Sequence, residues 1–223
     1  MQKILTVFKR HHDFRVYDEY DPQCEWIGEP GVRATEKLDG TNSQIMLTYE
    51  YRDGLVGDIE DYVLASFPTE EGRLFMLAGS RKRWIAPEST IMHMEEPVKG
   101  TDNFGFARWV QDNADELSKL GEGRHYGEWY GKGIQRGYGL DEKRFALFNV
   151  ARWGSHNPNT PACCQVVPIL ECKDPDEAMQ LLATSGSVAA PGFAYPEGIV
   201  VYHTASRTLY KETFEMDNGK WNA

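Results

Sequence analysis

The chain contains many short segments in which apolar and polar residues alternate, or in which apolar residues follow one another. The clearest is 43–49, which comes shortly after a turn at Gly40. A period of two, together with branched and aromatic side chains, is typical of β-strands. The same criteria predict further strands at 33–35, 62–66, 73–78, 125–130, 144–151, 198–203 and 208–213.

Two segments follow the helical period instead. Between 103 and 120 a stripe of apolar side chains ends at Gly121, and its members are Phe106, Trp109, Val110, Leu117 and Leu120. The second helix begins at Asp174, which can cap the first turn, and Pro175 is favoured at the first helical position. Many short strands with only two clear helices predict an α+β fold.

Composition limits the class of protein. With 223 residues, 41% of them hydrophobic, the chain can bury one sizeable core, and we expect a single domain over 1–223. No apolar run has the length of a membrane helix, and the start lacks the pattern of a signal peptide. The cysteines fit neither a disulfide framework nor a zinc motif, and they are Cys24, Cys163, Cys164 and Cys172. We therefore expect a cytoplasmic protein with reduced thiols and no membrane partner.

The formal net charge of -10 argues against a general affinity for nucleic acid. Two basic clusters nevertheless lie among aromatic residues. Arg81, Lys82 and Arg83 precede Trp84, and a second cluster surrounds Tyr138, with Lys132, Arg136, Lys143 and Arg144. Such clusters are usually solvated loops, but a pair of them can also line a groove along a phosphate backbone.

One lysine stands out by its neighbours. Lys37 lies in the string EKLDGTN, between two carboxylates and just before a glycine, at the predicted end of a strand. The string alone fits a solvated turn as well as a nucleophile, because short motifs recur by chance. A lysine attacks phosphorus only after losing its proton, which burial or a neighbouring positive charge promotes. Lys211, in the apolar segment 208–213, is a candidate for that second charge.

The remaining requirements of such a reaction also have candidates. Glu128 and Glu197 are carboxylates at strand-like positions, and glycines beside them, Gly127 and Gly198, could let the backbone approach a nucleotide. Phe145 or Phe148 could provide the aromatic face for a purine. Each of these residues also has an ordinary structural interpretation as a strand-face charge or a core side chain.

The ordered set EKLDGTN, GSRKR, YGEWYG, FALFNV, PEGIVVY and LYKE resembles the collinear motifs of the covalent nucleotidyltransferases, which include ATP-dependent ligases and capping enzymes. Within that group the chain most resembles the nick-sealing RNA ligases of phages, over residues 36–212. The resemblance implies an α+β nucleotidyltransferase core, the ATP-grasp-like adenylylation fold of ligases. It would have antiparallel sheets flanked by helices, the nucleotide in a cleft and no large C-terminal domain.

The resemblance also implies roles for individual residues. Lys37 would attack the α-phosphate of ATP, Lys211 would contact that phosphate, and Arg81 would contact the nucleotide and the 3'-hydroxyl end. Glu197 would serve with Mg²⁺ or Mn²⁺, Glu128 would bind the ribose and Phe148 would stack on adenine. The rest of the pocket would be lined by Glu36, Asp39, Thr41 and Asn42.

One motif departs from the family pattern. Relatives have a second lysine two residues from the position of Lys211, where this chain has Leu209 and Thr213, so Arg207 or Lys220 would have to supply that cation. The resemblance predicts an RNA ligase that repairs nicked duplexes or joins RNA ends. A DNA ligase of the same fold and a non-catalytic nucleic-acid-binding module are the alternatives.

Overall fold

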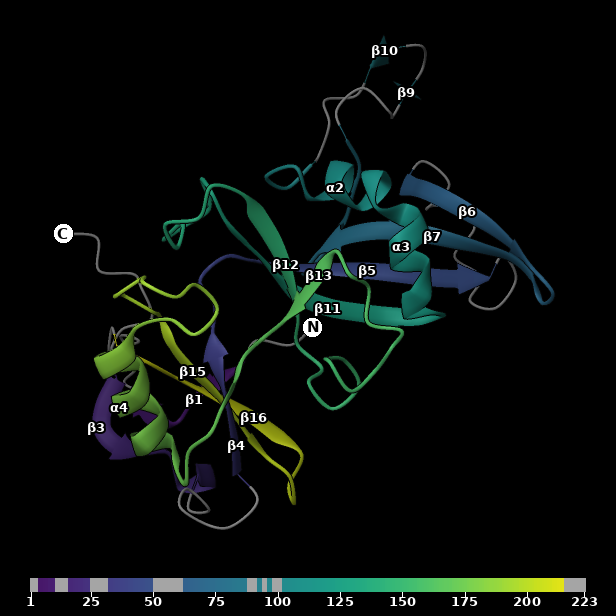
Figure 1. Cartoon of the computed structure of the whole chain (residues 1–223). Coiled ribbons are helices and arrows are strands. Elements are labelled where there is room, and N and C mark those ends of the chain that lie inside the picture. Colours follow the sequence, from purple (N-terminus) through teal and green to yellow (C-terminus); the bar gives the residue numbers. More distant parts are fainter. Residues whose placement is uncertain are drawn as a thin grey trace. The chain divides into compact units, whose positions relative to one another are not determined.

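The computed structural model describes residues 4–10, 16–24, 32–49, 62–87, 92–93, 96–97 and 102–214. The chain forms two compact units, and it passes between them more than once. The first unit comprises Gly40–Gly137 and Asp141–Val166, and the second comprises Gln2–Asp39, Tyr138–Leu140 and Val167–Ala223. Figure 1 shows the helices and strands of both units.

The first unit is built on a seven-stranded sheet with strand order β13-β12-β11-β5-β7-β6, in which β8 also pairs with β7. Every pairing is antiparallel except that of β12 with β13. The strands are β5 (Thr41–Tyr49), β6 (Val63–Thr69), β7 (Gly72–Ser80), β8 (Trp84–Ile85), β11 (Gly123–Gly131), β12 (Lys143–Leu147) and β13 (Cys164–Val166). A separate antiparallel pair joins β9 (Met92–His93) to β10 (Glu96–Pro97).

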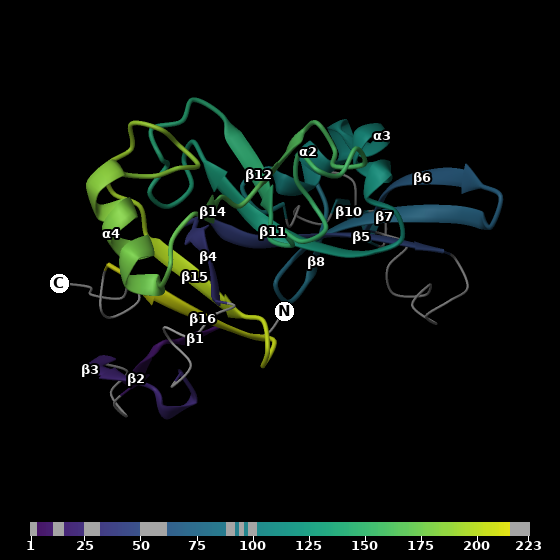
Figure 2. The same cartoon turned by 60° about the horizontal axis from the view of Figure 1, so that its bottom comes forward.

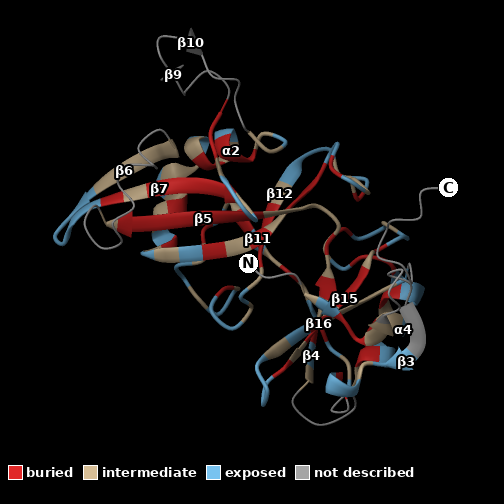
Figure 3. Ribbon diagram, turned by 180° about the vertical axis from the view of Figure 1, so that it is seen from behind, coloured by how far each residue is buried: buried red, intermediate tan, exposed pale blue. Residues whose placement is uncertain are grey.

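Short helices cover one side of this sheet: α2 (Phe106–Asp112), α3 (Ala114–Leu117) and the 3₁₀ turn η3 (Ser118–Leu120). Their apolar side chains join those of the central strands in one core, which includes Phe106, Val110, Ile45, Met76 and Trp129. Figure 3 shows long buried stretches along β5 and β7, as expected for the centre of the sheet.

The predicted helix over 103–120 is interrupted at Asn113. Its backbone leaves the helical region, with φ at -111° and ψ at 18°, and its Nδ2 donates to the carbonyl of Trp109 at 2.8 Å. Asparagine competes in this way for helical carbonyls, so one predicted helix becomes two short ones. The strand predicted over 144–151 also ends early, at Leu147, because Asn149 accepts hydrogen bonds from the following turn through both Oδ1 and its carbonyl.

The second unit contains a five-stranded sheet with order β1-β16-β15-β4-β14. Its strands are β1 (Leu5–Thr6), β4 (Val32–Lys37), β14 (Ile169–Leu170), β15 (Gly198–His203) and β16 (Thr208–Thr213), and only β1 and β16 pair in parallel. A hairpin of β2 (Phe8–Arg10) and β3 (Val16–Tyr20), followed by the 3₁₀ turn η1 (Pro22–Cys24), belongs to the same unit.

Helix α4 (Pro175–Ser185) packs on one face of that sheet, beside β15 (Figures 1 and 2). It begins as predicted, because Asp174 Oδ1 accepts the backbone N–H of Glu177 at 2.8 Å. Alternate strand residues meet the helix and form the second core, which includes Ala34, Ile199, Val201, Tyr210 and Leu182. The α+β fold with mainly antiparallel sheets is thus confirmed, while its two parallel pairings were not predicted.

Candidate active site

Lys37 lies at the end of β4, and its Nζ forms an ion pair with Glu197 Oε2. Both side chains are largely buried, with exposed fractions of 20% and 14%. Glu197 directly precedes β15, and the register aligns Lys37 with Gly198, the first residue of that strand. Pairing of β4 with β15 therefore brings together two residues that are 160 positions apart in the sequence.

Lys211 adds a second positive charge to the same group. It lies on β16 opposite Val200, two positions along β15 from Gly198, so strand alternation places it on the same face as Lys37. Burial raises the pKa of Glu197 above its ordinary value, and the charges of Lys37 and Lys211 oppose that rise. The structure thus brings Lys37, Glu197 and Lys211 together within the second unit, as the sequence predicted.

Gly198 has a structural role that the sequence did not reveal. Its φ is +150°, and a Cβ built there would lie 2.1 Å from the carbonyl oxygen of Glu212. A Cβ on Gly127 would likewise lie 2.4 Å from the carbonyl oxygen of Ala146. We interpreted these glycines as allowing a nucleotide to approach, but the close approach of neighbouring strands already requires both of them.

Glu36 is next to Lys37 but faces the other side of the sheet, and it is only 1% exposed. Its carboxylate accepts hydrogen bonds from the Ser187 hydroxyl at 2.6 Å and from the N–H groups of Val188 and Ala189 at 2.8 and 2.9 Å. Burial raises the pKa of Glu36, and these three donors partly offset the rise. The side chain anchors the segment after α4, and its predicted part in nucleotide binding stays a prediction.

Asp39 is held through its backbone, whose N–H donates to the hydroxyl of Tyr138 at 2.8 Å. Tyr138 is only 2% exposed and packs against Phe193, with ring centroids 4.9 Å apart. Of the two interpretations of the second basic cluster, a groove for nucleic acid would need an accessible ring at Tyr138, and this ring is buried. No local pattern distinguishes this tyrosine from an exposed one, since residues distant in sequence bury it.

In the first unit, the rest of the lysine string meets β11. The N–H of Gly40 donates to Glu128 Oε1 at 3.2 Å, and Asn42 is paired with Glu128 in the strand register. Thr41 Oγ1 accepts a hydrogen bond from Asn103 Nδ2 at 2.8 Å, a contact that the sequence did not reveal. Glu128 is therefore a neighbour of Gly40 and Asn42, although it lies 88 positions from Gly40 in the sequence.

The two phenylalanines of β12 and its end differ sharply. Phe145 is fully buried, and its ring centroid lies 5.0 Å from that of Phe106 and 5.9 Å from that of Trp109. Phe148 is half-buried, and it lies beyond the strand end, where its N–H donates to the carbonyl of Tyr126 at 3.0 Å. A core ring cannot also stack on a base, so Phe148 remains the candidate for the adenine contact.

The predicted basic clusters are only partly available to a ligand. Arg81 is exposed in the bend after β7, but the ring of Trp84 is covered by Arg124, whose Cζ lies 5.2 Å from the ring centroid. In the second cluster, Arg144 pairs with Glu142 at 2.8 Å and Lys143 donates to the carbonyl of Phe104 at 2.6 Å. Arg207 is exposed in the turn before β16, whereas Lys220 lies outside the described residues.

Among the described residues, no three histidine, cysteine, aspartate or glutamate side chains gather as a metal site would require. Mg²⁺ and Mn²⁺ prefer oxygen ligands, and Mg²⁺ is commonly held by one or two carboxylates together with substrate phosphates. The single carboxylate of Glu197 fits that mode of binding. In the part of the chain that the structure describes, no helix has the length and apolarity needed to span a membrane. The four cysteines are free thiols.

Two units with largely antiparallel sheets, one of them carrying a buried lysine–carboxylate pair at a strand end, define a nucleotidyltransferase fold of the α+β class. The family model described as RNA ligase matches residues 30–219, and the chain belongs to that family.

Solved structures of Naegleria gruberi RNA ligase variants share the fold. One with AMP and manganese is 17% identical, covers 95% of this chain and 61% of its own, and gives a TM-score of 0.52. One with ATP and manganese is 16% identical, covers 96% of this chain and 62% of its own, and gives 0.51. The chain thus spans about three fifths of the length of those ligases. No curated protein matches it.

Proposed function

We propose that the protein is an ATP-dependent RNA ligase that works through a lysyl-AMP intermediate on Lys37. The observation that carries this proposal is the arrangement of Lys37, Glu197 and Lys211, in which a largely buried amine lies beside a carboxylate and a second ammonium group. A surface lysine would be exposed and more weakly paired. This one is held in place by two strands, as a nucleophile requires.

The reaction would have three balanced steps. Lys37 Nζ, after losing its proton to solvent, attacks the α-phosphorus of ATP and forms a P–N bond, while the bond to the bridging oxygen breaks and pyrophosphate leaves. An oxygen of an RNA 5'-phosphate then attacks the same phosphorus, which breaks the P–N bond and frees the lysine. Finally the 3'-hydroxyl of the other RNA end attacks the activated 5'-phosphorus, forms the phosphodiester bond and releases AMP.

Two basic residues and a bound cation would stabilise the negative charge on the phosphates. Lys211 would stabilise negative charge on the α-phosphate, and Arg81 would contact the nucleotide and the 3'-hydroxyl end. Glu197 would hold a divalent cation, Mg²⁺ or Mn²⁺. When bound, that ion would supply positive charge to the phosphate oxygens of the transition state.

The adenosine part of ATP would be bound by the first unit's residues, with Phe148 stacking on the base and Glu128 contacting the ribose. Thr41 and Asn42 would complete that set. In the second unit, Asp39 would line the pocket around Lys37, while Glu36 would support the segment after α4. The string from Glu36 to Asn42 runs from one unit into the other, so we propose that residues 1–223 act as one catalytic domain. A cytoplasmic location belongs to the same proposal, because ATP and RNA are both available there.

The neighbouring structures support ATP and a divalent metal as cofactors, since two of those ligase variants were solved with AMP or ATP and manganese. The substrate would be a nicked duplex or RNA ends. A DNA ligase remains the second candidate within the same reaction class, because Lys37, Glu197 and Lys211 do not distinguish ribose from deoxyribose. A binding module is the candidate from another class.

A panel of nicked duplexes tests the proposal: all-RNA, all-DNA, and mixed strands with either a ribose or a deoxyribose at the 3'-hydroxyl end. We expect ATP-dependent sealing where that end is RNA and poor sealing of all-DNA nicks, because a terminal 2'-hydroxyl offers contacts that DNA lacks. Efficient sealing of every nick would make the protein a general or DNA ligase. Binding without sealing on any substrate would favour the non-catalytic module.

A further inference from the structure

A row of three side chains crosses the second unit's sheet on the face away from α4. The register places Tyr202 of β15 between Arg33 of β4 and Leu209 of β16. Arg33 is exposed, Leu209 is 45% exposed and Tyr202 is half-buried. Val201 and His203, the chain neighbours of Tyr202, are buried on the opposite face, as strand alternation requires.

This row shares its face with the reactive lysines. Lys37 lies four residues beyond Arg33 on β4, and Lys211 lies two residues beyond Leu209 on β16. Strand residues with even spacing point to the same side, and four residues of strand span about 13 Å. The row and the Lys37 group are therefore two parts of one continuous surface within a single unit.

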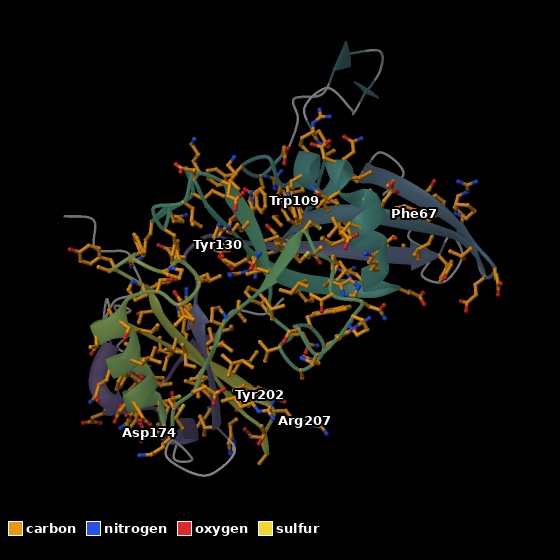
Figure 4. All side chains as sticks on the ribbon, in the orientation of Figure 1. Phe67, Trp109, Tyr130, Asp174, Tyr202 and Arg207 are labelled. Atoms are coloured by element: carbon orange, nitrogen blue, oxygen red, sulfur yellow. The ribbon has the colours of Figure 1, made fainter. Side chains whose placement is uncertain are left out.

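The charge of this face is opposite to that of the whole chain. The formal net charge is -10, yet the strand positions described on this face carry Arg33, Lys37 and Lys211, and the one carboxylate named beside them, Glu197, is paired with Lys37. The carboxylates of the same strands, Glu36 and Glu212, lie on the α4 side. Arg207 adds an exposed cation in the turn next to the row, and Figure 4 shows it near Tyr202 at the hairpin end of β15 and β16.

A ring beside a guanidinium group on an open sheet face has the chemistry that binds a single nucleic-acid strand. Aromatic side chains stack on bases without regard to sequence, and arginine neutralises the phosphates. The apolar surface of Leu209 extends the platform on the other side of Tyr202. Because Arg33 and Arg207 are positively charged, this surface favours a negatively charged ligand. RNA therefore suits it better than an apolar protein segment does.

We propose that the row Arg33–Tyr202–Leu209 binds one of the joined RNA strands about four nucleotides from the end that lies at Lys37. A stacked strand advances about 3.4 Å per nucleotide, so about 13 Å of sheet corresponds to about four steps. This inference rests on the proposed function and adds to it a strand-binding surface. Arg33 lies outside the ligase motifs, and the resemblance assigns no role to Tyr202 of PEGIVVY or to Leu209 of LYKE.

The first test is binding of single-stranded RNA to the full chain, measured by fluorescence anisotropy, which requires no catalysis. We expect Tyr202→Ala to bind about 5- to 150-fold more weakly, and Tyr202→Phe to bind like the parent protein because the ring is kept. Leu209→Ala should weaken binding, whereas Leu5→Ala should not, since Leu5 is an exposed side chain on the other face of the same sheet. Equal binding by Tyr202→Ala and the parent protein would overturn the proposal.

The second test uses salt. Arg33→Gln should reduce the slope of log affinity against log salt concentration by about one, the loss of one phosphate contact. The matched control is Arg73→Gln, an exposed arginine on β7 of the first unit, which should leave the slope unchanged. An unchanged slope for Arg33→Gln would remove the phosphate contact from the proposal and contradict it.

The third test uses strand length and separates this inference from the proposed function. Lysine adenylylation needs no RNA, so we expect its rate to be unchanged in Tyr202→Ala. An unchanged rate also shows that the variant is folded. Sealing by this variant should be impaired on long strands and equal to that of the parent protein when one strand is shortened to about three nucleotides. If Tyr202→Ala loses the same share of sealing activity however short either strand is made, the proposal is contradicted. Absence of adenylylation in the parent protein would refute the proposed function alone.

Discussion

The two faces of the second unit's sheet carry different kinds of residue, although both are built from the same strands. Glu36 and Lys37 are neighbours in the chain, and so are Lys211 and Glu212, yet each pair is divided between the faces. The α4 side holds the apolar core and two carboxylates. Glu36 accepts hydrogen bonds from the segment after α4, whereas Glu212 Oε2 has no hydrogen-bond partner among the described residues. The other side holds the lysines and Glu197. The string EKLDGTN therefore has residues on both faces, with Lys37 in the proposed active site and Glu36 bound to the segment after α4.

The largest loss of stability is expected in the first unit, where Phe145 of β12 belongs to the core and Phe148, just beyond the strand, belongs to the candidate site. Phe145→Ala removes a ring from the core and should lower the free energy of unfolding by about 3–5 kcal/mol. Phe148→Ala should leave the melting temperature nearly unchanged and weaken ATP-dependent adenylylation by about 5- to 150-fold, the range for loss of a stacked base. Thermal melting and adenylylation rates of both variants distinguish the roles. A large loss of stability in Phe148→Ala with normal adenylylation would assign this ring to the core.

A smaller loss of stability is expected at Glu36. Glu36→Ala leaves the hydroxyl of Ser187 and the N–H groups of Val188 and Ala189 without their acceptor, at a cost of about 2–4 kcal/mol. For a chain of this size that corresponds to a fall in melting temperature of about 5–15 °C. Glu36→Gln keeps an acceptor oxygen and should lose less. If Glu36→Ala melts like the parent protein but binds ATP poorly, the carboxylate belongs to the nucleotide site instead.

The smallest effect concerns Glu212. Burial and the nearby charge of Asp176 raise its pKa from 4.5 to about 7, and Glu212 Oε2 has no hydrogen-bond partner among the described residues. The folded protein then holds this proton more tightly than the unfolded chain does. Stability should therefore fall as pH rises from about 4.5 to about 7, by about 1–2 kcal/mol after allowance for partial exposure.

Melting curves between pH 4.5 and 8 check this prediction. Glu212→Gln should lose that part of the pH dependence and be the more stable protein at pH 8, whereas Glu171→Gln, at an exposed position, should follow the parent protein. Identical pH profiles for Glu212→Gln and the parent protein would show that the buried carboxyl does not titrate in this range.

The sequence predicted those elements whose pattern is local. The strands Gly198–His203 and Thr208–Thr213 and the capped start of α4 agree with the structure, because alternation and a capping aspartate are visible in a short window. Two-residue strands such as β1 and β14 carry too little pattern to be seen. The break at Asn113 depends on one side chain turning back to a carbonyl, which periodicity does not report.

The site was predictable in its residue types and less so in its contacts. The resemblance to ligase motifs named Lys37, Glu197 and Lys211, but their proximity depends on the register of three strands. The burial of Tyr138 and the capture of Glu36 by the segment after α4 also depend on residues distant in the chain. Composition could assign neither, because a tyrosine in a basic loop and a glutamate beside a lysine are usually exposed.

The central claim is that Lys37 is the nucleophile and that its neighbour Glu36 is structural. The most direct measurement is incubation of the purified protein with ATP and Mg²⁺ or Mn²⁺, followed by acid quenching and mass-spectrometric mapping of AMP on the peptides. We expect AMP on Lys37 in the parent protein and in Glu36→Gln, and a loss of at least about a thousand-fold in Lys37→Arg with an unchanged melting temperature. An adduct on another lysine, or no adduct with any nucleotide between pH 6 and pH 9, would contradict the account.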